Sequence, residues 1–386
     1  MTLIKSLLTT PSSFKLDRNK TISLSIWLLL AVALAAQSLI THRYNNYLIF
    51  ENTFRNLINQ TSFYAEYPQY HFDSNHYGPV FSVFFMPFAL LPNGLGLFLW
   101  DLFTTLALFF AINTLPLKKT NLIFLIAIPC LISSLLSEQS NPLIASIIIL
   151  SYTQLNKKRG LWSTLFIVLG TFIKLYGIVG LAFFLFVKDK KRFVLYLLMW
   201  AVVFFVLPMF FSSPEFIINS YKGWAVSLTN KNAINISDNN ISIMGFLRGA
   251  LSNPGISNLT FLMIGGVLFL IPYLNFKRYA DQNFQLLILA STLMFTVLFS
   301  TGSEDCTYII AIPGVGIWYL LTEKKIWKHY LLGLVVIFSC SFPQFLFHSL
   351  ALKYPMLSMM LCVPFFVVWL LTLVDAYNLK TNESNA

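Results

Sequence analysis

The sequence contains few charged residues for its length. Asp, Glu, Lys and Arg make up 11% of 386 positions, whereas hydrophobic residues make up 57% and mean hydropathy is +0.70. A soluble domain of this size does not need so much apolar surface, so lipid must be the solvent for much of the chain. The composition excludes an ordinary soluble globular protein and predicts an all-α polytopic membrane protein.

Cysteine is scarce as well, and no internal repeat of useful strength is present. The four cysteines show no CxxC spacing and all fall in or beside apolar runs: Cys130, Cys306, Cys340 and Cys362. We interpret them as small buried apolar residues rather than as disulfides or metal ligands. Many transporters are built from two repeated halves, so the lack of a repeat disfavours a transporter.

Apolar runs divide the chain into about twelve predicted transmembrane helices. Several are shorter than the roughly 20 residues that cross a bilayer. The predicted spans are 22–41, 93–115, 121–136, 142–155, 161–173, 175–187, 193–211, 259–275, 284–300, 307–321, 330–348 and 356–376.

Basic residues predict the orientation of these spans. Most of the 26 Lys and Arg fall in loops on one side, and the positive-inside rule makes that side cytoplasmic. The main clusters are Lys118–Lys119, Lys157–Arg159, Lys188–Arg192, Lys277–Arg278 and Lys324–Lys328. Both termini are then cytoplasmic, and the net charge of +11 reflects topology and contact with anionic lipid, not nucleic acid.

We expect one integral membrane domain over residues 1–386, with a first external loop at 42–92 and a second at 212–258. Apolar residues recur at helical spacing around Glu51 in the first loop. This pattern predicts an amphipathic helix along the membrane, with Glu51 and Arg55 as a solvated i,i+4 pair.

The charge count decides the placement of two ambiguous apolar stretches. Residues 80–91 are predicted to form an interfacial or re-entrant helix on the outer side. Residues 161–187 have basic residues at both ends, so we expect two short helices joined near Lys174. Lys174 then lies at membrane depth, where an ionisable group indicates function. A structural ion pair between Lys174 and Asp101 is the alternative.

The rest of the first external loop is the main candidate site. Glu66, His71, Asp73 and His76 follow one another in an irregular, aromatic stretch that no helical pattern explains. The spacing of His71, Asp73 and His76 also allows a metal ion. Two histidines and one aspartate are a weak signal, and we expect no metal and no cofactor.

A polar turn, SEQSN, separates two apolar runs at Ser137–Asn141. Asn141 before Pro142 fits a helix N-cap followed by proline at the first helical position. Capping does not explain Glu138 and Gln139.

Two further outer segments carry charge. A capped helix start is predicted in NNISIMGFLRGA, with Arg248 near the membrane interface. There the arginine can either pair with a lipid phosphate or extend its charged end toward the membrane surface. The acids of GSED, at Gly302–Asp305, open a span, where compensation of the helix dipole is a sufficient explanation.

Three segments, taken in order, resemble glycosyltransferase family 87. YGPVFSVFFMPFALLPNGLGLFLWDLF resembles its Y-P-P-x-F…P-(x)-A-L-L-P…W segment. SEQSNPLIASIIIL is similar to its G-Q-x-N-L-L-L turn and keeps Gln139 and Asn141. GTFIKLYGIVGLAFFLFVKDKKR is similar to its A-x-x-L-K-P-Y-P-L-L…R-R-R stretch and keeps Lys174. The resemblance covers roughly residues 20–200.

The resemblance implies a GT-C-like membrane mannosyltransferase that uses polyprenyl-phosphate sugars. The family often has Asp-Phe just after the first span, and that aspartate is its usual candidate base. The corresponding place here holds Asn45–Asn46, which cannot accept a proton. Pro79 keeps the second proline of Tyr-Pro-Pro, and Gly78 replaces the first.

We therefore expect inverting transfer of a hexose, mannose first, from a polyprenyl phosphate to an acceptor hydroxyl at the outer face. Candidate bases are Asp73, then Glu66 or Glu138. Candidate cations for the donor phosphate are Lys174, Arg248 and His76. Candidate substrate-binding residues are Tyr64, Tyr77, Gln139 and Asn141, and Tyr67 and Tyr70 are further rings for sugar stacking.

The expected partners are a polyprenyl-phosphate sugar, a glycan or lipid acceptor, and membrane lipids. We expect a multi-pass protein of a bacterial inner (plasma) membrane. The alternative is a transporter or flippase of a lipid-linked or small polar substrate, favoured by Asp101 and Lys174. A third interpretation, a non-catalytic assembly partner, has only Asn45–Asn46 in its favour.

Overall fold

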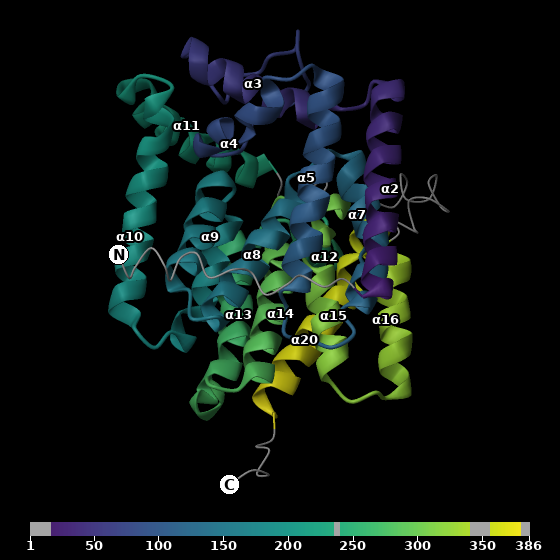
Figure 1. The fold of residues 1–386 in the computed structure, drawn as a ribbon. Helices are drawn as coiled ribbons and strands as arrows, with labels where there is room; N and C mark the ends of the chain where they lie inside the picture. The colour runs from purple at the N-terminus through teal and green to yellow at the C-terminus, as the bar shows by residue number, and fades with distance from the viewer. Residues whose placement is uncertain (1–16, 235–239, 340–355, 380–386) are drawn as a thin grey trace.

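The computed structural model describes residues 17–234, 240–339 and 356–379, and within these ranges all regular structure is helical. The helices form one bundle in which long and broken helices run side by side (Figure 1). The α-fold class is therefore confirmed. Cys130, Cys306 and Cys362 are buried as expected, and Cys340 lies outside the described residues.

The first half of the bundle runs from α2 to α10. Its elements are α2 (Arg18–Thr41), α3 (Asn45–Asn59), α4 (Val80–Ala89), α5 (Asn93–Asn113), α6 (Asn121–Ile126), α7 (Ile128–Leu136), α8 (Asn141–Asn156), α9 (Gly160–Ile173), the 3₁₀ helix η1 (Leu175–Phe186) and α10 (Lys190–Val206).

The second half begins with the 3₁₀ turn η2 and continues to α20. Its elements are η2 (Leu207–Phe210), α11 (Pro214–Ile234), α12 (Ile243–Ala250), α13 (Asn258–Leu270), η3 (Ile271–Leu274), η4 (Phe276–Arg278), α14 (Gln282–Leu298), η5 (Asp305–Ile309), α15 (Ile312–Leu321), α16 (Ile326–Ser339), α19 (Met356–Met359) and α20 (Cys362–Tyr377). The predicted start of α12 is confirmed, because the Ser242 side chain accepts a hydrogen bond from Gly245 N.

Among the described residues, four helices are long and apolar enough to cross a membrane: Arg18–Thr41, Asn93–Asn113, Lys190–Phe210 and Met356–Tyr377. Shorter apolar helices account for most of the other predicted spans. These features agree with a membrane protein. The count of twelve crossings stays a prediction.

The short helices of the first external loop lie across one end of the bundle (upper end in Figure 1), as does part of α11. Helix α4 has ten residues, which agrees with the prediction that this stretch does not cross the membrane. Helix α3 contains the predicted Glu51–Arg55 pair, but the pair is not fully solvated. Glu51 is buried on the inner face of α3, and only Arg55 is exposed.

Several predicted cytoplasmic clusters gather at the opposite end. Lys158, Arg159, Lys188 and Arg192 line one shared cavity there. Arg278 donates to the backbone oxygen of Leu379 at the end of the described chain. The grouping agrees with the sidedness inferred from the charges, and which side is cytoplasmic remains a prediction.

The chain reverses at Lys174, between α9 and η1, as the charges at both ends predicted. Lys174 has extended backbone angles (φ −151°, ψ 109°) and so interrupts the helix. The two arms pack closely because Gly170 and Gly177 meet there. A Cβ atom on Gly177 would lie 2.2 Å from Thr171 N. The reversal aims the lysine side chain into the bundle instead of along its surface.

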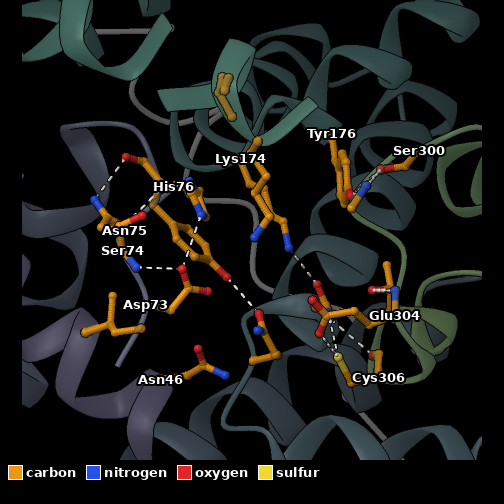
Figure 2. Close-up of a pocket in the computed structure, with 18 of the residues that line it drawn as sticks. Asn46, Asp73, Ser74, Asn75, His76, Lys174, Tyr176, Ser300, Glu304 and Cys306 are labelled. Atoms are coloured by element: carbon orange, nitrogen blue, oxygen red, sulfur yellow. Dashed lines mark hydrogen bonds and ion pairs between the residues drawn. The ribbon is translucent and has the colours of Figure 1, made fainter. Parts of the chain in front are cut away.

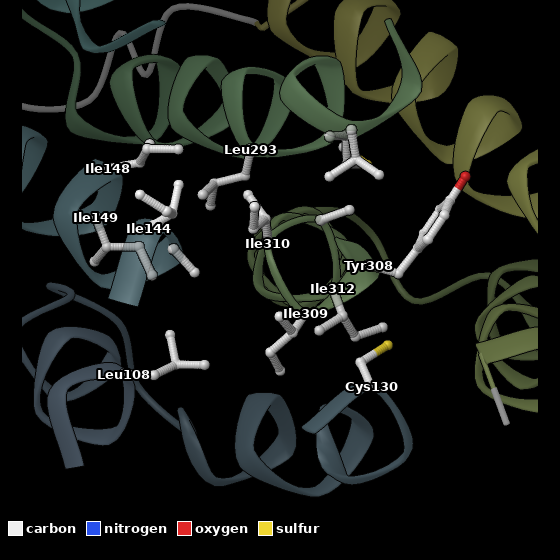
Figure 3. Packing of buried hydrophobic residues seen from close by; sticks show 14 of the residues in the cluster. Leu108, Cys130, Ile144, Ile148, Ile149, Leu293, Tyr308, Ile309, Ile310 and Ile312 are labelled. Atoms are coloured by element: carbon white, nitrogen blue, oxygen red, sulfur yellow. The ribbon is translucent and has the colours of Figure 1, made fainter. Parts of the chain in front are cut away.

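Buried aliphatic side chains fix the segment that begins at η5. Ile309, Ile310 and Ile312 pack against Ile144 of α8 and Leu293 of α14 in the main core (Figure 3). Such close-packed contacts resist displacement. They hold the loop just before η5 in place against the end of α8.

We predict that Gly177→Ala destabilises the protein, because the added methyl group overlaps backbone atoms of α9. Overpacking of this kind costs about 1–3 kcal/mol. Thermal unfolding in detergent measures the effect as a lower melting temperature. Gly266→Ala on α13 is the control, since no atom lies within 4 Å of its added Cβ. Equal melting temperatures for the two variants would contradict this account of the reversal.

Candidate active site

A cavity of about 540 Å³ lies between the first external loop and the ends of several helices. Figure 2 shows Asp73 and Glu304 on opposite sides of it, with Lys174 reaching in between them. The polar residues that matter most in its lining are Asp73, His76, Tyr77, Gln139, Asn141, Lys174, Lys231 and Glu304. The structure thus gathers side chains that are up to 231 residues apart in sequence, from Asp73 to Glu304.

The backbone of Asp73 is fixed by neighbouring side chains, while its carboxylate is exposed to the cavity. Its φ of 68° lies in the left-handed region, which is uncommon for a residue other than glycine. The ring of His71 braces it: Nδ1 lies 3.1 Å from Asp73 O, and Nε2 lies 3.2 Å from Asn52 Nδ2. These partners indicate that Nδ1 carries the proton. Because both nitrogens of His71 are used, the His71–Asp73–His76 metal arrangement is not formed.

His76 lies beside the Asp73 carboxylate. Its Nε2 is 3.9 Å from Asp73 Oδ1, and its Nδ1 is 2.9 Å from the hydroxyl of Ser227 on α11. Trp224 donates to the backbone oxygen of His76 and ties the loop to α11. Burial, with a further contribution from nearby Lys231, lowers the pKa of His76 to about 4. His76 is therefore neutral at pH 7 and does not supply the positive charge predicted for it.

Lys174 enters the cavity among aromatic rings. Its Nζ donates to Asn141 Oδ1 at 3.1 Å and lies 5.5 Å and 5.0 Å from the ring centres of Tyr77 and Tyr176. The alternative ion pair with Asp101 is not formed. Asp101 is buried in α5, and neither of its carboxylate oxygens has a hydrogen-bond partner within the described part of the chain.

Asn141 and Gln139 connect the polar turn to the cavity. The prediction that Asn141 caps α8 is wrong: Ser140 is the N-cap, and Asn141 is the first helical residue. The Asn141 amide instead donates to Cys306 O while accepting from Lys174. Gln139 accepts a hydrogen bond from the Tyr77 hydroxyl at 3.0 Å. Burial raises the pKa of Tyr77, so its hydroxyl keeps its proton and remains a donor.

Sequence reasoning missed two charged residues of the cavity, Lys231 and Glu304. Lys231 comes from α11 and shares the cavity with Lys174. Burial lowers the pKa of Lys231, while the carboxylates of Asp73 and Glu304 act in the opposite direction. Glu304 caps η5, as the dipole explanation requires, and it lines the cavity too. The sequence feature that could have identified both residues is their position in polar segments predicted to be external.

Other candidates lie outside this cavity. Glu138 is buried on the far side of its turn, where its carboxylate accepts from Ser38 of α2. Arg248 is buried in α12, where it donates to Ile256 O and to Asn258 and lies over the Phe261 ring.

Glu66 and Tyr64 line a second cavity of about 750 Å³ next to the first. Tyr67 and Tyr70 line neither of the two. Among the described residues, no group of three or more His, Cys, Asp and Glu side chains is close enough to hold a metal ion.

Asn45 and Asn46, at the position where the family usually has aspartate, hold loops in place. The Asn45 amide makes two hydrogen bonds to the backbone of Phe72, one donated and one accepted. Asn46 donates to Ser137 O in the polar turn. Gly78 also has a local reason: its N–H donates to Ile173 O, a bond that proline lacks the hydrogen to make.

An apolar helical bundle with a charged cavity between its loops defines a membrane protein that handles a polar substrate. Residues 75–301 match the sequence profile of glycosyltransferase family 87, which is more than half of the chain. The chain therefore belongs to this family and is a glycosyltransferase. The match begins later and extends further than the resemblance read from motifs. No relative among curated proteins matches it significantly.

We predict that His76 makes a contribution to stability that is lost as pH falls from about 6.5 to about 4. His76 stays neutral in the fold, whereas in the unfolded chain it gains a proton below its ordinary pKa of 6.5. The unfolded state therefore binds more protons in this window, and the difference amounts to about 3 kcal/mol. Melting temperatures across this range measure the loss. His76→Asn should remove this contribution, so the difference in melting temperature between wild type and variant should change across the range. A constant difference would contradict the assignment.

Proposed function

We propose that the chain transfers a hexose, mannose first, from a polyprenyl phosphate to an acceptor hydroxyl, with inversion at the anomeric carbon. The observation that carries the proposal is one cavity that holds a carboxylate on each of two sides, Asp73 and Glu304, and two lysines, Lys174 and Lys231. In-line displacement needs a base near the attacking hydroxyl and positive charge near the leaving phosphate. Family membership supports sugar transfer as the reaction.

Asp73 is the proposed base. The acceptor hydroxyl gives its proton to the Asp73 carboxylate as its oxygen bonds to the anomeric carbon. The bond from that carbon to the phosphate oxygen breaks, and the electron pair leaves with the phosphate. His76 lies beside this carboxylate, at 3.9 Å, as a neutral neighbour. Glu304, across the cavity, is the second candidate base.

Lys174 and Lys231 are the proposed partners of the donor phosphate. Both line the same cavity, and Lys174 is fixed by Asn141 and two tyrosine rings, so little reorganisation is needed as charge develops. Gln139 and Tyr77 would contact the sugar from the polar turn and the first loop. Arg248 and Glu138 have no part in this mechanism, because neither lines the cavity.

The earlier alternative, a transporter or flippase, rested on Asp101 and Lys174 acting at membrane depth. The two side chains do not pair, and Lys174 belongs to the polar cavity. Membership of a glycosyltransferase family favours chemistry over transport. Donor flux in proteoliposomes without any sugar transfer would revive the alternative.

We predict that Asp73→Asn lowers the transfer rate by about 10²–10⁴-fold, since the side chain keeps its size but no longer accepts the proton. The assay uses the reconstituted protein with polyprenyl-phosphate mannose and measures the rate at saturating donor. Glu215→Gln, an exposed acid on α11 outside both cavities, is the control. If Asp73→Asn kept full activity and Glu304→Gln lost it, Glu304 would be the base. If both variants kept full activity, the proposed mechanism would be wrong.

We predict that Lys174→Gln and Lys231→Gln each lower the rate on the order of 10²-fold, because each removes a positive charge near the leaving phosphate. Glutamine at 174 retains a donor for Asn141, which limits structural loss. Lys222→Gln, on the same helix as Lys231 but exposed, should leave the rate unchanged. If both Lys174→Gln and Lys231→Gln kept full activity, the phosphate assignment would be wrong.

A further inference from the structure

The second cavity adjoins the first along a shared wall. Its volume is about 750 Å³, within the range of small-molecule sites. The residues that line both cavities are Asp73, Ser74, His76, Lys231, Gly302 and Glu304. The carboxylate proposed as the base therefore faces two spaces at once, which is the position that a two-substrate transfer requires.

The two cavities differ in charge. The first has Lys174 and Lys231 against Asp73 and Glu304. The second has Lys231 alone against three carboxylates, those of Glu66, Asp73 and Glu304. The charges balance in the first cavity and leave an excess of negative charge in the second, so an anionic group is better accommodated in the first than in the second.

The two cavities also differ in apolar lining. Leu175, Leu228, Ile49 and Phe50 line the first, and Leu175 is 45% exposed, so its side chain offers a lipid tail a surface at the edge of the cavity. Large aliphatic side chains are fewer around the second, where Val226 is the bulkiest. An isoprenoid chain has its apolar contacts in the first cavity.

The polar groups of the second cavity suit a sugar. Ser62, Asn230 and Glu66 offer a hydroxyl, an amide and a carboxylate. The Tyr64 ring stands among them, held by its hydroxyl, which donates to Tyr77 O at 3.2 Å. Gly223 leaves room for this ring, because a Cβ there would lie 3.0 Å from Tyr64 Cδ2. A fixed aromatic face beside a few hydrogen-bonding groups is a common arrangement in small-molecule sites.

We propose that the second cavity is the acceptor site and takes an uncharged glycan, whose hydroxyl reaches Asp73 across the shared wall. The inference rests on the proposed function, because it uses the in-line direction of attack. The leaving phosphate lies with the two lysines in the first cavity, so the hydroxyl must approach from the opposite side of the sugar. The second cavity opens onto Asp73 from outside the first.

The test blocks the second cavity and leaves the first open. Asn230→Trp puts a bulky ring into the acceptor cavity. Thr229→Trp, at the preceding residue of α11, is the matched control, because Thr229 lines neither cavity. The probes are methyl glycosides of mannose, glucose and galactose as acceptors, with polyprenyl-phosphate mannose as donor. We expect Asn230→Trp to raise the KM for the best glycoside at least about tenfold, with donor binding unchanged.

Charge selectivity supplies a second readout. Mannose 6-phosphate should be a poorer acceptor than methyl mannoside by about tenfold or more, and Glu66→Gln should narrow the gap, because it removes one repelling carboxylate. A preference for the phosphorylated sugar would overturn the assignment of an uncharged acceptor.

The outcomes separate this inference from the proposed function. If wild-type protein transfers sugar and Asn230→Trp leaves the acceptor KM unchanged, the acceptor site is wrong and the proposed function stands. If wild-type protein neither binds nor uses the polyprenyl donor, the proposed function is wrong. Direct binding of the glycosides, measured by saturation-transfer NMR, still tests the cavity: binding lost in Asn230→Trp alone supports it, and equal binding in both variants overturns it.

Discussion

The contact between Lys174 and Asn141 is the interaction on which the site depends. An ammonium group within an apolar bundle needs a polar partner, and one amide supplies it while also holding the backbone of Cys306. Three parts of the chain thereby meet at one side chain: the reversal between α9 and η1, the start of α8 and the start of η5. The packed isoleucines at the end of η5 and just beyond it make this meeting point rigid. The position of Glu304 follows from it.

Much of the architecture could be predicted because it follows from length and charge. The reversal at Lys174 was predictable since basic residues at both ends of the stretch place both ends on the same side of the membrane, so the chain must turn back between them. Helix α4 was predictable for a similar reason. The directions of the side chains in the polar turn, Ser137–Asn141, were harder to predict from the sequence, because adjacent residues point in opposite directions. Glu138 has a left-handed backbone (φ 45°) and turns toward α2, whereas Gln139 turns into the cavity.

The site itself could be predicted only where its residues are close in sequence. Asp73, His76 and Tyr77 share one irregular loop, so a local pattern was enough to select them. Lys231 and Glu304 join them from segments more than 150 residues later, and only the folded chain brings them there. The family match does not help with the carboxylates, since it begins after Asp73 and ends before Glu304. Physical position, not motif, identifies both acids.

Asn45 holds the loop that carries Asp73, although its own side chain cannot act as a base. Its amide first accepts a hydrogen bond from the N–H of Phe72, the residue just before Asp73, and second donates one to the carbonyl of Phe72. An aspartate at this position could accept the first bond but could not donate the second, so the carbonyl of Phe72 would face a carboxylate oxygen. An aspartate at position 45, as the family usually has, would thus loosen the loop that carries Asp73, the proposed base. In this chain the side chain at position 45 has a structural task, and that task requires an amide.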